Sequence, residues 1–161
     1  PDPVVYIDDR WLYDQEDELE PLQELDLALE RPRKVKSGDG VTIVASGYST
    51  RQALAAATAL ENESISAEVV DLRVINPIYP ELIIESVKKT GRLVVLDGGW
   101  SNCGLAGEIT AQVVESTSLD VFTKSPIRIT LPDAPAPTAK PLEQLYYPSD
   151  ETILSQIKAL F

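Results

Sequence analysis

Histidine and methionine are absent from the 161 residues, and cysteine occurs once, at Cys103. Without histidine, the chain cannot build a Cys-His or Ser-His catalytic pair, and it has no imidazole to offer a metal ion. A single cysteine cannot form an internal disulfide, which fits a reducing, cytoplasmic location. Because the chain starts at Pro1 and contains no methionine, we also expect it to be part of a longer protein.

Basic residues are scarce, above all at the N-terminal end. The formal net charge is -12, and nearly all of it comes from residues 1–30, where eleven Asp and Glu face one base, Arg10. Neither this arm nor the nearly balanced remainder has the basic surface that a nucleic acid or an anionic membrane requires. No apolar run reaches the length of a membrane span, about 18 residues, and no signal-peptide pattern opens the chain. We therefore expect no nucleic-acid partner and no membrane partner.

Apolar periodicity changes at residue 41, where short β-branched runs begin to alternate with helical patterns. Such alternation is typical of a sheet covered on both faces by helices. Strands are predicted at Val41–Ser46, Ala67–Leu72, Arg92–Asp97 and Ile127–Leu131. Helices are predicted from Ser49, with Gln52 at capping-box spacing, to Asn62, from Pro80 to a stop at Gly91, through Leu105, Ile109 and Val113, and from Ser149 onward. The proline-rich "PDAPAPTAKPLEQLYYP" is predicted to be irregular.

The arm is predicted to be different in kind from the rest. "PVVYI" has the composition of a strand, and the acidic stretch after it that of a solvated connector. A lone strand needs a sheet to join, so Val4–Ile7 would be the end of a domain that this chain lacks.

The glycine-rich "LDGGWSNCGLAGE", Leu96–Glu108, is the most unusual segment. Its glycines do not have the G-x-G-x-x-G spacing of a dinucleotide loop, although the helix start after it would attract an anion. We favour a structural strand-to-helix turn over a phosphate site. With no histidine to act as base, Cys103 is interpreted as a small packed residue and not as a nucleophile.

Two further patterns have both a chemical and a structural interpretation. The sequence "GDG" at Gly38–Gly40, with Asn62 later in the chain, is similar to the motif with which thiamine-diphosphate enzymes bind magnesium. Here the motif precedes a strand, so we favour a turn over a metal site. Asp97, Glu108 and Asp133 are the carboxylates near strand ends, and nothing in the sequence pairs them for acid–base work, so we favour structural roles. No catalytic, cofactor-binding or metal-binding residue is therefore predicted in this chain.

Three motifs at matching spacing point to one family. They are "DLRVINP" (Asp71–Pro77), the loop from Asp97 through Gly104 and Gly107 to Glu108, and the D-x-P-x-P of Asp133, Pro135 and Pro137. With the runs around them, they resemble the C-terminal transketolase-like domain of the β subunit of thiamine-diphosphate-dependent 2-oxo acid dehydrogenases, of the pyruvate dehydrogenase type. The resemblance covers residues 33–161, and residues 1–32 resemble the end of the preceding pyrimidine-binding domain with an acidic linker.

The resemblance implies a specific fold. The family has a three-layer α/β/α sandwich around a five-stranded mixed sheet whose first strand runs antiparallel at one edge. In this chain that strand would come from about Arg33–Lys36. The turn at Gly38–Gly40 would by itself pair it with Val41–Ser46, but the family places it beside Ala67–Leu72, and we follow the family.

The resemblance also implies a function. The complete enzyme oxidatively decarboxylates pyruvate or a related 2-oxo acid with thiamine diphosphate and magnesium, held by the α subunit and the missing β domain. This domain would serve assembly, through the contact between β subunits and the docking of the dihydrolipoyl acyltransferase component, and would be inactive alone. Trp100 is a candidate subunit contact, and Asp120 and the C-terminal Phe161 are candidate acyltransferase contacts. The alternatives are a free-standing anion- or nucleotide-binding module that uses the Gly104–Glu108 helix start, and an enzyme that uses Cys103.

Overall fold

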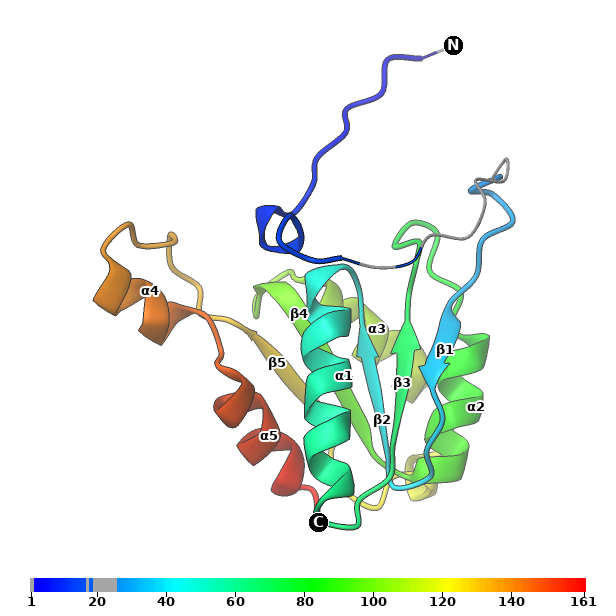
Figure 1. Ribbon diagram of the computed structural model, residues 1–161. Coiled ribbons are helices and arrows are strands. Elements are labelled where there is room, and N and C mark those ends of the chain that lie inside the picture. The colour runs from blue at the N-terminus through cyan, green and yellow to red at the C-terminus, as the bar shows by residue number, and fades with distance from the viewer. Residues whose placement is uncertain (1, 17, 19–25) are drawn as a thin grey trace.

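The computed structural model describes residues 2–16, 18 and 26–161, and its elements alternate as the sequence predicts (Figure 1). The strands are β1 (Arg33–Lys36), β2 (Val41–Ala45), β3 (Ala67–Asp71), β4 (Leu93–Trp100) and β5 (Ile127–Leu131). The helices are α1 (Tyr48–Glu61), α2 (Glu81–Thr90), α3 (Leu105–Glu115), α4 (Lys140–Tyr146) and α5 (Asp150–Lys158), with short 3-10 turns η1 (Arg10–Leu12) and η2 (Leu119–Val121). No helix in the described ranges is long and apolar enough to cross a membrane.

The sheet has the predicted mixed topology. Its strand order is β1-β3-β2-β4-β5, with β1 antiparallel to β3 and the other pairs parallel. Arg33 of β1 lies opposite Asp71 of β3, so the edge strand pairs as the family resemblance implied and not across the Gly38–Gly40 turn. Gly38 explains why that turn is tight, because a Cβ there would lie 2.3 Å from the backbone carbon of Ala67.

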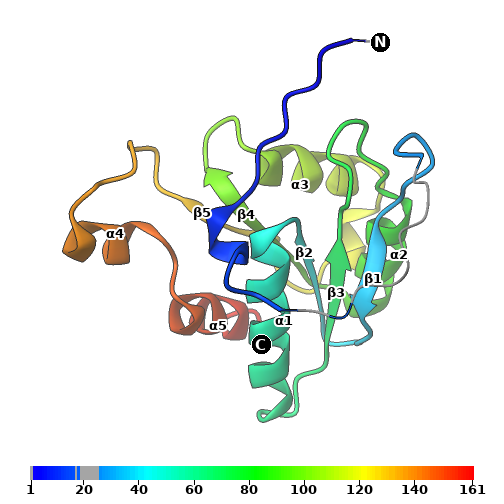
Figure 2. The ribbon, with the colours of Figure 1, turned by 45° about the horizontal axis from the view of Figure 1, so that its top comes forward.

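Helices cover both faces of the sheet, which confirms the three-layer sandwich (Figures 1 and 2). One core joins α1 and α5 to the sheet and includes Ile43, Leu60 and Ile153; the other joins α2 and α3 to the opposite face and includes Val44, Ile83 and Ile109. All five residues of β2 are buried because this central strand has helices on both sides.

Local signals set several of the helix ends. Gly91 ends α2 in the left-handed conformation (φ 68°), and Ser149 caps α5 by accepting from the amide of Thr152. Pro80 precedes α2 as its N-cap. The predicted capping box at Ser49 is wrong, because the chain turns sharply at Gly47 (φ 55°), α1 starts at Tyr48, and Ser49 is buried inside the first turn.

Two other predictions need correction, and a third stays a prediction. The proline-rich segment contains α4, which tolerates Pro141 because the first turn of a helix needs no donor there. Strand β4 continues past Asp97 to Trp100, since Trp100 pairs with Leu131 of β5. Val4–Ile7 pairs with no described strand and each of these residues is more than 80% exposed, so the assignment of this segment to the sheet of another domain stays a prediction. The acidic connector includes residues 17 and 19–25, which lie outside the described residues.

One charged side chain lies inside the domain. Glu68 of β3 is fully buried, and its Oε2 faces the ammonium groups of Lys34, at 3.3 Å, and Lys89, at 2.5 Å. Burial raises the pKa of Glu68, but hydrogen bonds from Lys89, Ser86, the Gly38 amide and Lys34 outweigh burial and hold that pKa below its usual value. Glu68 therefore ties the edge strand β1 and helix α2 to β3.

Candidate functional site

The glycine-rich segment forms a structural turn at the carboxyl edge of the sheet. Asp97 at its start accepts hydrogen bonds from the backbone amides of Gly99, at 2.9 Å, and Ala106, at 3.0 Å. The second bond caps the first turn of α3 with the chain's own carboxylate. Because Asp97 already supplies a negative charge there, the geometry does not favour an anion at the Gly104–Glu108 helix start.

Asp133 fastens the same turn from the other side. It accepts from the Asn102 amide at 3.1 Å, from Ser101 Oγ at 3.2 Å and from the side-chain amide of Asn102. Arg128 adds a bond to the Ser101 carbonyl at 3.0 Å. The D-x-P-x-P motif thus holds the loop between β4 and α3.

The three candidate carboxylates have the structural roles that we favoured. Asp97 and Asp133 accept backbone amides, while Glu108 accepts from the side chain of Gln112 on the same helix. Cys103 is exposed at a positive φ of 55°, so the predicted packed position is wrong. No group of three or more Cys, Asp or Glu that could hold a metal occurs among the described residues.

Trp100 is an exposed aromatic residue joined to helix α4. Its ring is half exposed, its indole donates to the Tyr146 hydroxyl at 3.0 Å, and Tyr146 in turn donates to the Ala134 carbonyl at 2.7 Å. These bonds attach α4, which projects from the body of the domain and exposes Leu142 and Leu145 (Figure 2). We call Trp100, Leu142 and Leu145 the α4 surface.

The other two predicted contact residues lie together at the opposite edge. Asp120 belongs to the exposed turn η2, next to Val121, whose carbonyl lies against Gly91. Phe161 lies over the Arg92 guanidinium, with 4.4 Å from the carbon to the ring centroid, and Arg92 also donates to the Leu160 carbonyl at 3.0 Å. Since Gly91 and Arg92 are neighbours, the structure brings η2 and the C-terminus to one edge and leaves Trp100 at the other.

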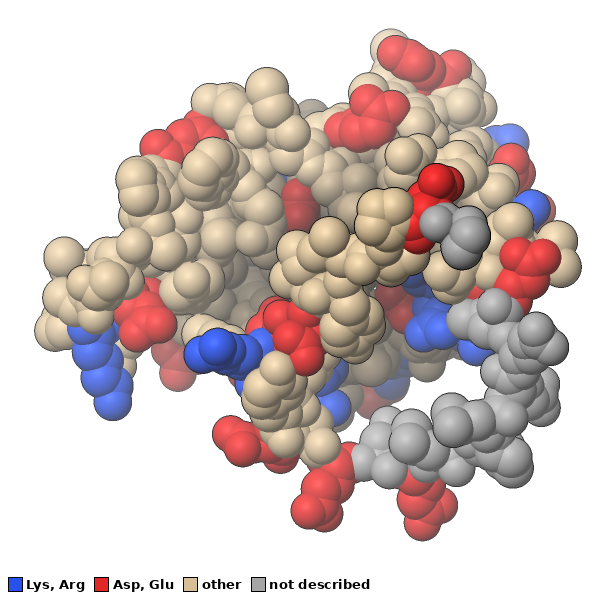
Figure 3. Space-filling view, turned by 90° about the horizontal axis from the view of Figure 1, so that it is seen from above, with Lys and Arg blue, Asp and Glu red and all other residues tan. Residues whose placement is uncertain are grey.

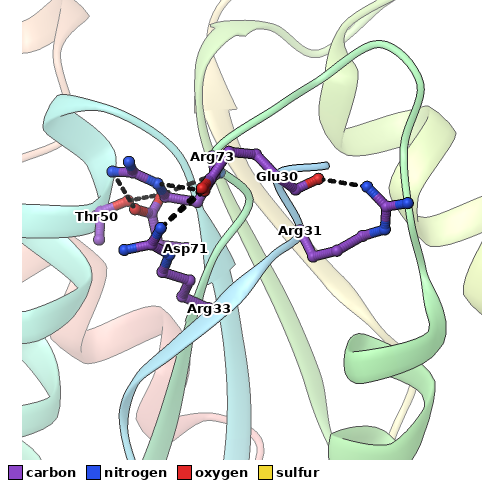
Figure 4. Close-up of polar contacts among 6 residues, drawn as sticks. All are labelled: Glu30, Arg31, Arg33, Thr50, Asp71 and Arg73. Carbon is purple, nitrogen blue, oxygen red and sulfur yellow. Dashed lines mark hydrogen bonds and ion pairs between the residues drawn. The ribbon is translucent and has the colours of Figure 1, made fainter. Parts of the chain in front are cut away.

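A charged cluster that the sequence interpretation missed joins the arm to the domain. Glu30 forms ion pairs with Arg33, at 2.9 Å, and Arg73, at 3.6 Å. Arg73 also approaches Asp71, which accepts from Thr50 of α1 at 3.2 Å. Figure 4 shows these side chains converging where β3 ends and β1 begins.

The same cluster explains the first family motif. Asp71 of "DLR" is the last residue of β3, and Arg73, two residues later, has a positive φ of 63° and pairs with Glu30. Arg31 packs its guanidinium on the Tyr79 ring at 3.7 Å. The sequence signal for this cluster was an Asp at the end of a strand with an Arg two residues later. Glu30, the partner of Arg73, lies 43 residues earlier in the chain, and only the fold brings these two residues together.

The family scan agrees with this geometry. The model described as "Transketolase, C-terminal domain" matches residues 31–153. The chain belongs to the transketolase C-terminal domain family. The resemblance seen in the three motifs is thereby confirmed, together with the fold class.

Individual relatives place this transketolase C-terminal domain more closely. It is 37% identical over 161 residues to the "Pyruvate dehydrogenase E1 component subunit beta" of Rickettsia bellii, covering 97% of this chain and 47% of the relative. It is 36% identical over 148 residues to the "Acetoin:2,6-dichlorophenolindophenol oxidoreductase subunit beta" of Cupriavidus necator, covering 92% and 43%. A solved structure titled "Split gene transketolase, inactive beta4 tetramer" superposes with a TM-score of 0.73 at 27% identity, covering 90% and 46%. The chain spans about half the length of the curated relatives it matches.

Proposed function

We propose that this domain is the assembly domain of the β subunit of a thiamine-diphosphate-dependent 2-oxo acid dehydrogenase. The observation that carries the proposal is the match to pyruvate dehydrogenase β subunits over 97% of the chain at 37% identity. The complete enzyme would act on pyruvate or a related 2-oxo acid. A subunit of an acetoin oxidoreductase is almost as similar to this chain, so the sequence of this domain does not distinguish the substrates. We assign the choice of substrate to other parts of the complete enzyme.

The residues of this domain do not fit the cofactor of such an enzyme. Asp39 of the Gly38–Gly40 turn is exposed at the amino edge of the sheet, and Gly38 packs against the backbone of Ala67, which is the arrangement of a tight turn before a strand and not of a diphosphate cradle. We therefore assign thiamine diphosphate and magnesium to the α subunit and to the pyrimidine-binding domain of β. The exposed Val4–Ile7 would join the sheet of that domain, and residues 1–32 would form its end and the linker.

The α4 surface is the proposed contact between β subunits. Isolated apolar side chains are common on surfaces, but Trp100, Leu142 and Leu145 are each more than half exposed, and the Trp100–Tyr146 bond orients the indole. A half-exposed tryptophan, joined to a helix that exposes two leucines, has the composition of an interface anchor. The solved structure titled an inactive β4 tetramer of a split-gene transketolase supports an assembly role for a chain of this fold.

Replacing the exposed indole tests this contact. Trp100→Ala in the complete β subunit is expected to weaken self-association about tenfold, because it removes the anchor ring and leaves α4 less firmly attached. Sedimentation velocity over a concentration series measures the change. Trp11→Ala is the matched control, since Trp11 is also half exposed but lies on η1. Equal association constants for the Trp100 and Trp11 variants would contradict the assignment.

The edge that carries Asp120 and Phe161 is the proposed docking surface for the dihydrolipoyl acyltransferase component. Both residues are exposed; the side chain of Asp120 provides negative charge for basic side chains of the partner, and the ring of Phe161 provides an apolar contact. Asp120→Asn and Phe161→Ala are each expected to reduce affinity for the acyltransferase's subunit-binding segment about tenfold, and the loss in Asp120→Asn should be larger at low salt. Surface plasmon resonance at two salt concentrations measures this. Asp150→Asn is the control, because it removes the same charge at the far end of α5. An equal loss of affinity in that control would contradict a specific docking surface.

A further inference from the structure

A pocket of about 450 Å³ opens at the carboxyl edge of the sheet, between β2 and β4. The chain runs from β2 outward to β3 and later returns to place β4 on the other side of β2, so the strand order reverses at this point. In open α/β sheets, ligands bind in the crevice at such a reversal. Figure 3 looks down on this edge, where uncharged side chains cover much of the surface.

The hydroxyl of a mostly buried serine opens to this pocket. Ser49 of α1 is only 6% exposed and lines the pocket, yet its Oγ makes no hydrogen bond with any residue that the structure describes. A Cβ built on Gly98 of β4 would lie 3.7 Å from that oxygen, which places the hydroxyl between α1 and β4. Its neighbour Thr50, by contrast, donates to Asp71. The only buried side-chain nitrogen or oxygen without a partner among the described residues is Glu68 Oε1, so Ser49 Oγ is accessible from the pocket and can pair with a polar group bound there.

The remaining walls are aromatic and acidic. Trp11 packs its ring centroid 5.2 Å from Tyr48 and 5.3 Å from Tyr147, and the three rings form one wall. Asp9 and Asp97 provide two carboxylates, and none of the described residues that line the pocket is a lysine or an arginine. Aromatic faces beside carboxylates favour an organic cation.

The N-terminal end of α1 carries partial positive charge, which disfavours a cation in the pocket, but this charge is smaller than that of the two carboxylates. A helix N-terminus contributes about half a positive charge. Asp9 and Asp97 contribute two full negative charges, of which that of Asp97 is partly offset by the first turn of α3 through the Ala106 amide. The sum stays negative, so the field in the pocket favours a cation over an anion.

We propose that this pocket binds a small organic cation of the guanidinium or alkylammonium class. The cationic head lies against Asp9 and the aromatic wall, and one of its N–H groups donates to Ser49 Oγ. This assignment is independent of the proposed assembly function, because the pocket includes none of the contact residues named above.

Tryptophan fluorescence can test the pocket directly, since the chain has two tryptophans and only Trp11 lines it. In a Trp100→Phe background, n-butylguanidinium is expected to change the Trp11 emission saturably in the millimolar range, about tenfold more tightly than the neutral n-butylurea. Pentanoate, at equal ionic strength, is expected to give no saturation. Two-dimensional NMR should show the amides of Gly47, Ser49 and Gly98 shifting with the same dissociation constant.

Two variants and one control decide the assignment. Asp9→Asn keeps the oxygen that caps Trp11 but removes the charge, and it should weaken n-butylguanidinium about fivefold; Ser49→Ala should weaken it about threefold. Asp39→Asn removes the same charge from an exposed turn at the other edge of the sheet and should change nothing. Binding of n-butylurea as tight as that of the cation, an equal loss in Asp39→Asn, or no saturation up to about 50 mM would each overturn the proposal.

Discussion

Gly104→Ala is expected to lower the free energy of unfolding by about 3 kcal/mol, because a methyl group there has no room. A Cβ at this position would lie 2.0 Å from the carbonyl oxygen of Trp100 and 3.4 Å from Asp97 Oδ2. The first contact is with backbone, which no side-chain rotation can relieve. The turn must therefore open, and the Asp97 cap on α3 weakens with it.

Chemical denaturation followed by far-UV circular dichroism measures this loss. Gly98→Ala is the matched control, since the added methyl would meet only Ser49 Oγ at 3.7 Å, an ordinary contact, and should cost less than about 1 kcal/mol. Similar stabilities for the two alanine variants would show that the turn adapts freely and that the close approach is unimportant.

Glu68→Ala is expected to lower the free energy of unfolding by about 2 kcal/mol at neutral pH. The carboxylate is fully buried, and its removal leaves Lys34 and Lys89 without their shared partner. The loss stays below that for a fully buried pair because the lysine side chains are 37% and 43% exposed and can turn to water. Glu68→Gln, which keeps the volume and one acceptor oxygen, should lose less than the alanine variant.

The effect of Glu68 should depend on pH in a defined direction. Its folded-state pKa lies below the unfolded value of about 4.3, because the hydrogen bonds from Lys89 and the other donors outweigh burial. A carboxylate with a lowered pKa stabilises the fold above the unfolded pKa, and this contribution disappears as the pH falls through the folded pKa. The difference in unfolding free energy between wild type and Glu68→Gln should therefore shrink below about pH 4. A difference that stays constant from pH 7 to pH 3 would contradict this account.

Local sequence signals were sufficient for most of the elements. Apolar β-branched runs located the strands, and Gly91 and Ser149 marked helix ends, because strand burial and helix caps depend on residues a few positions apart. They failed where an element depends on what lies beside it. Strand β4 extends to Trp100 because β5 runs alongside, and the residues near Trp100 in the sequence do not reveal this.

The candidate site shows the same division. The glycine-rich turn could be interpreted from the sequence as structural, and Asp97 and Asp133 as structural acids, since the chain has no histidine and the glycine spacing lacks a phosphate-loop pattern. The partners of these acids could not be predicted. Asp133 meets Asn102 across 31 residues, and Trp100 meets Tyr146 across 46, and contacts at such separations have no local pattern.

The amino-acid sequence by itself determined the order of strands and helices, the fold class and the absence of histidine chemistry. The tertiary structure decided which charges are buried, which polar groups pair and which surfaces are exposed. In the sequence Glu68 is an isolated acid in an apolar strand, and only the packing of β1 and α2 brings Lys34 and Lys89 to its carboxylate. In the sequence Ser49 has the spacing of a helix cap, but the turn at Gly47 makes it a buried residue of the first turn of α1, next to β4. The physical reason is that burial and pairing depend on distances in space, which the packing of elements sets and which separation along the chain does not encode.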